Sequence, residues 1–247
     1  MKSLLLVTSA LAAFAAAPAL AQDGPVGSVG VSYGNTEFDL GGVGGDADSW
    51  AVDGVVAMPA FGEWTVTVAA NASEFEDADD TTLVGTAHLT TLVGSDLRVG
   101  GFVGAADVAD ETALTGGFEV QKYLSRATLT GVVAYTTADD VDLDAWSVGG
   151  DAAFYVTDAL RLNAGVSWMT IEDADVDGVS YGVGAEYQIA GTPFSATAGY
   201  SHSDIEDLDI DSWTVGLRYS FGGGLQARDR AGAALPGSGV MGLLGAL

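Results

Sequence analysis

The sequence predicts an all-β fold, a transmembrane antiparallel up-and-down β-barrel of about twelve strands, with ten as the other strand count considered. Three observations predict it. Apolar and polar residues alternate along the chain, short turns alternate with acidic connectors, and the mean hydropathy is +0.29 although the net charge is −26. Strands that turn one face to lipid account for this hydropathy without a long apolar helix.

The first 21 residues have the composition of a secretory signal peptide. Lys2 supplies the positive start, residues 4–17 form an apolar run, and Ala19-Leu20-Ala21 fits the small-x-small cleavage pattern. A membrane anchor is the alternative, but the apolar run is short, rich in alanine and without a basic flank. We therefore expect an exported chain that begins at Gln22.

The clearest strand covers residues 211–221, where the odd positions from Trp213 to Phe221 are apolar and the even positions are small or polar. Aromatic residues stand at both ends of its apolar face, which is typical of a strand that crosses a bilayer. The same alternation, weakest over residues 26–48 because of glycine, predicts strands at 26–36, 49–58, 63–73, 82–93, 97–106, 112–122, 126–137, 145–156, 160–171, 179–189, 193–202 and 212–221.

The connectors alternate in length and charge. Those at residues 59–62, 94–96, 124–125, 157–159 and 190–192 are short. Those at 37–48, 74–81, 107–111, 138–144, 172–178 and 203–211 are longer and mostly acidic. Transmembrane barrels carry short turns on one side of the membrane and longer loops on the other. An even strand number then places all the acidic connectors on one side.

Together these features resemble a small porin-type outer-membrane β-barrel of a Gram-negative bacterium. Tyr219-x-Phe221 is similar to the closing strand of that family, whose final aromatic residue is the assembly signal, although here residues 222–247 follow it. The resemblance covers residues 22–221. It implies short periplasmic turns, acidic external loops, and contacts with outer-membrane lipid or lipopolysaccharide and with the barrel assembly machinery. The resemblance does not distinguish a monomer from a homotrimer.

Charged residues with inward parity predict a polar lumen. They are Arg98, Arg161, Arg218, Asp53, Glu119, Asp151 and Glu186. Charges inside a barrel must be paired or hydrated, and twelve strands enclose more room than side chains readily fill. We favour a narrow water-filled pore in which arginines face acids at a constriction. A closed interior braced by salt bridges is the alternative.

Acidic residues in the external connectors follow an alternate spacing, so they continue the outward rows of Trp146, Tyr181 and Trp213. They are Asp142 and Asp144, then Asp173, Asp175 and Asp177, then Asp207, Asp209 and Asp211. Such oxygen clusters suit Ca²⁺ or Mg²⁺ bridged to lipid phosphates. A solvated acidic surface is the alternative, and we favour it. Residues 173–178 begin like an EF-hand, but Gly184 stands where glutamate is required.

Two other function classes are not expected. His88 has inward parity and His202 lies between two serines, but their spacing supplies no aligned nucleophile, base and orienting group, so no enzyme is predicted. Lys122 is the one lysine left after removal of the signal peptide, which argues against nucleic-acid binding. The chain contains no cysteine and therefore no disulfide.

Residues 222–247 are predicted to form a flexible C-terminal tail, because the segment begins with three glycines. In the alternative, the tail folds back and Arg228 and Arg230 meet acids at the pore mouth, acting as a plug.

The function predicted from the whole sequence is a porin-like channel for passive diffusion of small hydrophilic solutes. It should mildly favour cations, because an acidic rim raises their local concentration. The main alternative is a non-conducting structural barrel whose acidic loops bind divalent cations or lipid head groups. Adhesion through the loops is a third option, which their small area disfavours.

Overall fold

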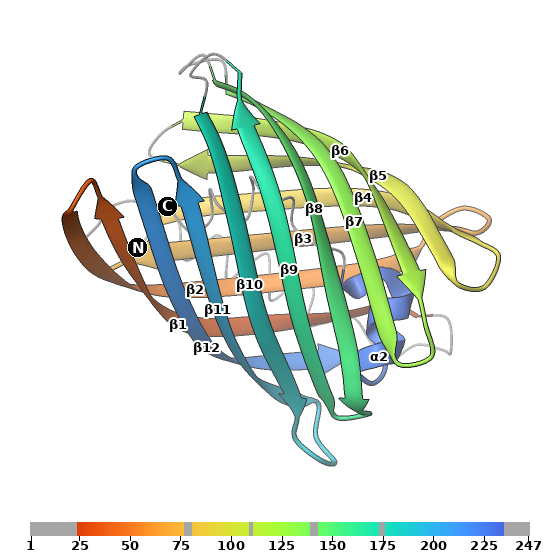
Figure 1. The fold of residues 1–247 in the computed structure, drawn as a ribbon. Coiled ribbons are helices and arrows are strands. Elements are labelled where there is room, and N and C mark those ends of the chain that lie inside the picture. The colour runs from red at the N-terminus through yellow and green to blue at the C-terminus, as the bar shows by residue number, and fades with distance from the viewer. Residues whose placement is uncertain (1–23, 77–80, 109–110, 139–142, 173–175, 235–247) are drawn as a thin grey trace.

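Twelve antiparallel strands form a closed barrel in the computed structural model, which describes residues 24–76, 81–108, 111–138, 143–172 and 176–234 (Figure 1). Each strand pairs with its neighbours in sequence, and the last strand pairs with the first. The fold class and the strand count of twelve are therefore confirmed. The predicted signal peptide, residues 1–21, lies outside the described residues. The strands are β1 (Val26–Leu40), β2 (Val43–Pro59), β3 (Trp64–Phe75), β4 (Thr81–Val93), β5 (Leu97–Val108), β6 (Glu111–Tyr123), β7 (Ala127–Ala138), β8 (Leu143–Thr157), β9 (Leu160–Ile171), β10 (Val176–Gln188), β11 (Phe194–Ile205) and β12 (Leu208–Phe221).

The barrel wall is apolar outside and polar inside, the reverse of a water-soluble core. On β7, Leu129 and Val133 are 45% and 41% exposed, whereas Thr128 and Thr136 are 2% and 0% exposed. Side chains alternate across a strand, so each strand presents its apolar row to lipid and its polar row to the lumen. The outward rows predicted on β7, β9 and β10 are confirmed.

The strands at the acidic end are longer than predicted. Only Gly41 and Gly42 lie between β1 and β2, and only Glu206 and Asp207 lie between β11 and β12. Gly41 and Gly42 both have positive φ angles, of 59° and 89°, as a two-residue hairpin turn of this kind needs. The long loops predicted at 37–48 and 203–211 are therefore wrong. Pairing with neighbouring strands continues through these acidic residues and overrides their weak strand propensity.

The opposite end of the barrel carries the short turns that the sequence predicts. These connections cover residues 60–63, 94–96, 124–126, 158–159 and 189–193. β12 also ends there, so the C-terminal residues leave the wall at the short-turn end.

Residues 222–234 turn back from the end of β12 into the barrel. Gly222 and Gly223 have positive φ angles, and they are followed by α2 (Leu225–Arg228) and the π-helical turn η2 (Asp229–Ala233) (Figure 1). Among the described residues, no helix has the length and apolar character needed to cross a membrane. The flexible tail predicted for 222–247 does not hold over residues 222–234, which are folded. Residues 235–247 lie outside the described part of the chain.

Candidate functional site

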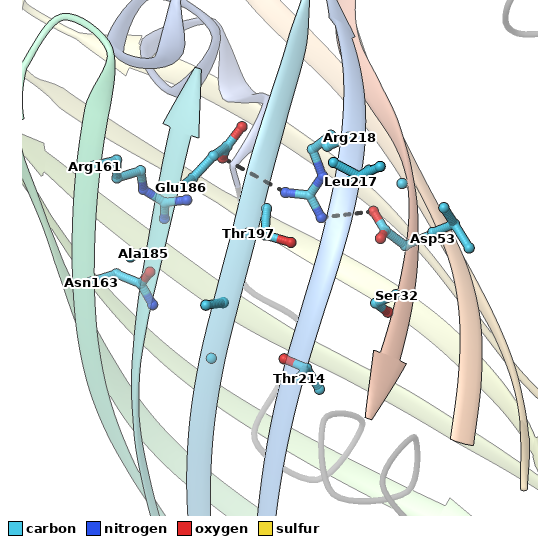
Figure 2. Close-up of a pocket in the computed structure, with 14 residues that line it drawn as sticks. Ser32, Asp53, Arg161, Asn163, Ala185, Glu186, Thr197, Thr214, Leu217 and Arg218 are labelled. Atoms are coloured by element: carbon cyan, nitrogen blue, oxygen red, sulfur yellow. Dashed lines mark hydrogen bonds and ion pairs between the residues drawn. The ribbon is translucent and has the colours of Figure 1, made fainter. Parts of the chain in front are cut away.

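A chain of ion pairs runs along the lumen side of the wall from β2 to β10 and ends on the C-terminal segment, residues 222–234. The Arg218 Nη2 atom lies 2.9 Å from Asp53 Oδ2, and its Nη1 atom lies 3.8 Å from Glu186 Oε2. The other oxygen of Glu186 lies 3.2 Å from Arg228 Nη2. Figure 2 shows Arg218 between Asp53 and Glu186. The two arginines and two acids balance in charge, as groups removed from bulk water must.

Gly30 on β1 allows the pair between Arg218 and Asp53 to form. It is the register partner of both residues, one on β12 and one on β2, so it lies directly between them. A Cβ atom at this position would stand 2.5 Å from Asp53 Oδ1. The missing side chain therefore leaves the space in which the two charged groups meet.

Two cavities of about 200 and 340 Å³ adjoin this network and share Arg161, Asn163, Glu186 and Arg218. The smaller cavity also contacts Asp53. The larger cavity is lined by Asp151 and Tyr155 of β8 and by Leu225, Arg228 and Asp229 of the C-terminal segment. Five of the seven predicted pore-lining residues thus lie around one polar space: Asp53, Asp151, Arg161, Glu186 and Arg218.

The other two predicted pore-lining residues, Arg98 and Glu119, lie in separate contacts on β5 and β6. Arg98 is 3% exposed and donates from Nε to the Tyr123 hydroxyl at 2.8 Å and from Nη1 to Thr90 Oγ1 at 2.8 Å. Its Nη2 donates to the Arg230 carbonyl oxygen at 2.9 Å. Arg98 therefore holds the C-terminal segment in place and is not part of the charge network.

Glu119 forms a buried polar contact with His88. The His88 Nδ1 atom lies 3.0 Å from Glu119 Oε1, and its Nε2 atom lies 3.0 Å from Thr86 Oγ1. This hydroxyl–imidazole–carboxylate order resembles a catalytic relay, which the sequence did not indicate. However, the three side chains are buried and Phe102 stacks against the imidazole, with ring centroids 5.3 Å apart. We interpret the contact as a brace between β4 and β6.

The C-terminal segment is held by residues from opposite parts of the wall. Thr67 of β3 donates to the Gly232 carbonyl oxygen at 3.0 Å, and Tyr155 of β8 donates to Asp229. The Arg230 guanidinium lies 5.8 Å from the ring centroid of Tyr123 on β6. A segment anchored on these separate strands narrows the lumen at the short-turn end.

The acidic end of the outer face carries three similar pairs of aromatic residues. In each, a tyrosine on one strand is the register partner of a tryptophan on the next: Tyr33 with Trp50, Tyr135 with Trp146, and Tyr200 with Trp213. An aspartate stands two residues before each tryptophan. Such aromatic rows mark the interface between hydrocarbon and head groups.

These aspartates accept hydrogen bonds from neighbouring side chains. Asp48 accepts from Asn35 Nδ2 at 2.9 Å, and Asp144 accepts from the Tyr135 hydroxyl at 2.6 Å. Asp211 accepts from the Tyr200 hydroxyl and lies 2.9 Å from His202 Nδ1. Asp144 and Asp211 thus lie on the outer face, as their parity predicts.

The candidate metal ligands are not gathered into a site within the described residues. There, no group of three or more histidine, aspartate or glutamate side chains is arranged to hold a metal ion. Asp209 lies 3.9 Å from His202 Nε2, Asp177 is exposed on β10, and Asp207 is exposed in the β11–β12 turn. Asp142, Asp173 and Asp175 lie outside the described residues.

Asn163, Tyr155 and Asp229 line the cavities but were not identified from the sequence. Asn163 and Tyr155 could have been found, because each shares inward parity with a residue that was, Arg161 and Asp151 respectively. Asp229 could not, because no periodic pattern indicates where a segment after the last strand will lie.

A family model described as outer membrane protein beta-barrel domain matches residues 6–221. Among solved structures, the KdgM porin is 6% identical with a TM-score of 0.56 and covers 78% of this chain and 99% of its own. The NanC porin is 6% identical with a TM-score of 0.59 and covers 77% and 100%. An outer membrane channel from Pseudomonas putida F1 is 11% identical with a TM-score of 0.57 and covers 83% and 98%. At these identities the likeness shows the fold alone. No curated protein matches the chain.

Proposed function

The chain belongs to the outer membrane protein beta-barrel domain family of the bacterial outer membrane, and we propose that it is a porin-like channel for passive diffusion of small hydrophilic solutes. The observation that carries this proposal is the charged lumen, with cavities of about 200 and 340 Å³ beside the ion-pair network. A polar, partly empty interior behind an apolar wall suits a water-filled path.

The C-terminal segment supports a narrow path. Leu225 and Arg228 are 3% and 6% exposed, so residues around the segment occupy much of the lumen at the short-turn end. Space remains beside the segment in the larger cavity, which its residues help to line. We therefore expect small solutes to pass and larger ones to be excluded.

A mild preference for cations follows from the distribution of charge. The acidic end carries exposed carboxylates such as Asp207 and Asp209, which attract cations to the mouth. Asp53, Glu186 and the arginines between them largely cancel inside the barrel. Because exposed charges are screened by salt, the preference should weaken as ionic strength rises.

The test is osmotic swelling of liposomes that contain the refolded full-length chain. Folding is first checked by the change in gel mobility on heating. We expect swelling in small uncharged sugars at rates that fall steeply with solute size, and no swelling in protein-free liposomes. A folded barrel that admits none of these sugars would overturn the proposal.

One observation favours a structural barrel as a second candidate function. The repeated arrangement that places Asp48, Asp144 and Asp211 next to interfacial aromatic residues sets carboxylates beside lipid head groups. Divalent cations could then link them to the phosphates of outer-membrane lipid or lipopolysaccharide. Calorimetric titration of Ca²⁺ and Mg²⁺ into the barrel in lipid tests this candidate. If no heat of binding is measured for either cation, this candidate function is excluded.

We propose no enzymatic activity. The one relay of hydroxyl, imidazole and carboxylate groups described above, formed by Thr86, His88 and Glu119, is buried and stacked against Phe102. A nucleophile needs an open approach for its substrate. A Thr86→Val variant that is less stable to urea but keeps full swelling would support a structural role for this relay.

A further inference from the structure

We propose that the larger cavity binds a zwitterionic solute of the amino-acid class, with its carboxylate on Arg161 and its ammonium group between Asp151 and Asp229. This inference rests on the proposed channel function and names a class of solute for it. The cavity, of about 340 Å³, lies directly on the C-terminal segment and is lined by all three residues.

Arg161 is the cation available to a ligand. The guanidinium groups of Arg218 and Arg228 are both engaged by Glu186. Among the described residues, no carboxylate oxygen lies within 4.0 Å of Arg161, and its Nε atom is buried without a hydrogen-bond partner. Figure 2 shows Arg161 and Asn163 at the neighbouring cavity, and both residues belong to β9. A planar guanidinium suits a carboxylate, because two of its parallel N–H donors match the two carboxylate oxygens.

The same cavity also offers two acids, and one of them, Asp229, has an acceptor atom without a partner. Asp229 is 2% exposed, and its Oδ2 atom accepts from Tyr155 while its Oδ1 atom is buried without a partner. Arg161 attracts the Asp151 carboxylate electrostatically, and Asp229 repels it. An ammonium group carries three donors and no acceptor, so it would satisfy these oxygens and relieve the repulsion.

The acidic mouth selects among the possible ligands. A purely anionic solute is repelled by exposed acids such as Asp207 and Asp209 before it reaches Arg161. A purely cationic solute passes the mouth but leaves Arg161 without a partner. A net-neutral solute with separated charges meets neither obstacle, because each of its ends finds a complementary group.

The test is equilibrium titration of the refolded full-length chain in detergent with L-alanine, acetate and ethylamine. We expect L-alanine to bind at millimolar concentration and the two singly charged analogues to bind at least about tenfold more weakly, as loss of one charge-assisted contact implies. Arg161→Gln and Asp151→Asn should each weaken the binding of L-alanine by about tenfold or more. Arg126→Gln, on an exposed turn, is the matched control and should change nothing.

The outcomes separate the solute site from the channel. Equal binding of acetate and L-alanine, or unchanged L-alanine binding by Arg161→Gln, would overturn the inference. If uncharged sugars cause swelling but L-alanine does not bind, the result supports the channel and contradicts the zwitterion site. If L-alanine binds as expected but no sugar enters the liposomes, the result supports the zwitterion site and contradicts the channel. Should Arg161→Gln fail to fold, Arg161→Lys replaces it. It keeps the charge without the planar fork and should still weaken binding.

Discussion

The acidic rim, which is the end of the barrel opposite the short turns, and the lumen use carboxylate groups in opposite ways. At the rim, Asp48 and Asp144 accept hydrogen bonds from neutral side chains, which leave their negative charge uncompensated. In the lumen, both oxygens of Glu186 lie near guanidinium groups, those of Arg218 and Arg228. The rim therefore acts at a distance through its field, whereas the lumen acts through contacts.

This difference divides selectivity between the two regions. A field from exposed charges decays within about 8 Å at physiological ionic strength. Contacts with Arg161 and Asp151 inside the barrel act between groups that touch the ligand, well within one Debye length, so they are screened much less. We expect the rim to set a weak preference for charge sign, and the lumen to set recognition of shape and charge arrangement.

Removal of the C-terminal segment should have the largest effect on the lumen. Ending the chain at Gly224 removes Arg228 and Asp229, together with the contacts they make with Glu186 and Tyr155. Because this segment narrows the short-turn end, we expect single-channel conductance in planar bilayers to rise severalfold.

The rim is unchanged by this truncation and serves as an internal reference. The ratio of cation to anion permeability at low salt should therefore stay above one. An unchanged conductance from a truncated chain that folds would show that the segment does not narrow the path.

The buried contact between His88 and Glu119 should matter most for stability. His88→Leu leaves Glu119, 5% exposed, without its imidazole partner, so we expect a loss of about 3 kcal/mol in the free energy of unfolding. Urea unfolding in lipid vesicles, followed by tryptophan fluorescence, measures it. The double variant with Glu119→Leu should recover part of this loss. If the His88→Leu variant is as stable as the parent, the contact between His88 and Glu119 does not stabilise the barrel.

Gly30→Ala should have a smaller effect on the lumen. The added Cβ atom would lie 2.5 Å from Asp53 Oδ1 and push this carboxylate away from Arg218. Because Arg218 keeps Glu186, we expect a loss of only about 1–2 kcal/mol. Gly85→Ala on β4 is the matched control, since its Cβ would meet nothing within 4 Å. Equal stability of the two variants in urea would mean that the space at Gly30 is not needed.

Changes at the rim should have the smallest effect. Asp207→Asn with Asp209→Asn removes two exposed charges, so the cation preference in planar bilayers should fall slightly at 0.1 M salt, where the Debye length is about 10 Å. At 1 M salt the variant and the parent should not differ. A large change at high salt would mean that these residues contact the permeating ions directly.

The sequence predicts the wall of this barrel well, because lipid outside and water inside impose a period of two on every strand. That period identifies Arg161 and Glu186 as lumen residues. It does not show that Gly30 lets Arg218 reach Asp53, because this depends on the register of three strands.

The acidic connectors and the C-terminal segment are less predictable for a physical reason. Residues 37–40 continue β1 because β2 and β12 supply backbone hydrogen bonds that outweigh the low strand propensity of aspartate and glycine. Residues 225–234 have no strand period, and their position depends on partners such as Thr67 and Arg98, which lie more than 100 residues earlier. Local patterns carry no information about such contacts.

The most direct test of a wet, charge-lined path is single-channel recording of the refolded full-length chain in a salt gradient. We expect discrete current steps whose size increases with salt, and a reversal potential that favours cations at low salt and approaches zero at high salt. If the barrel is folded by its gel mobility but gives no current steps, this result would contradict the channel and favour the structural barrel.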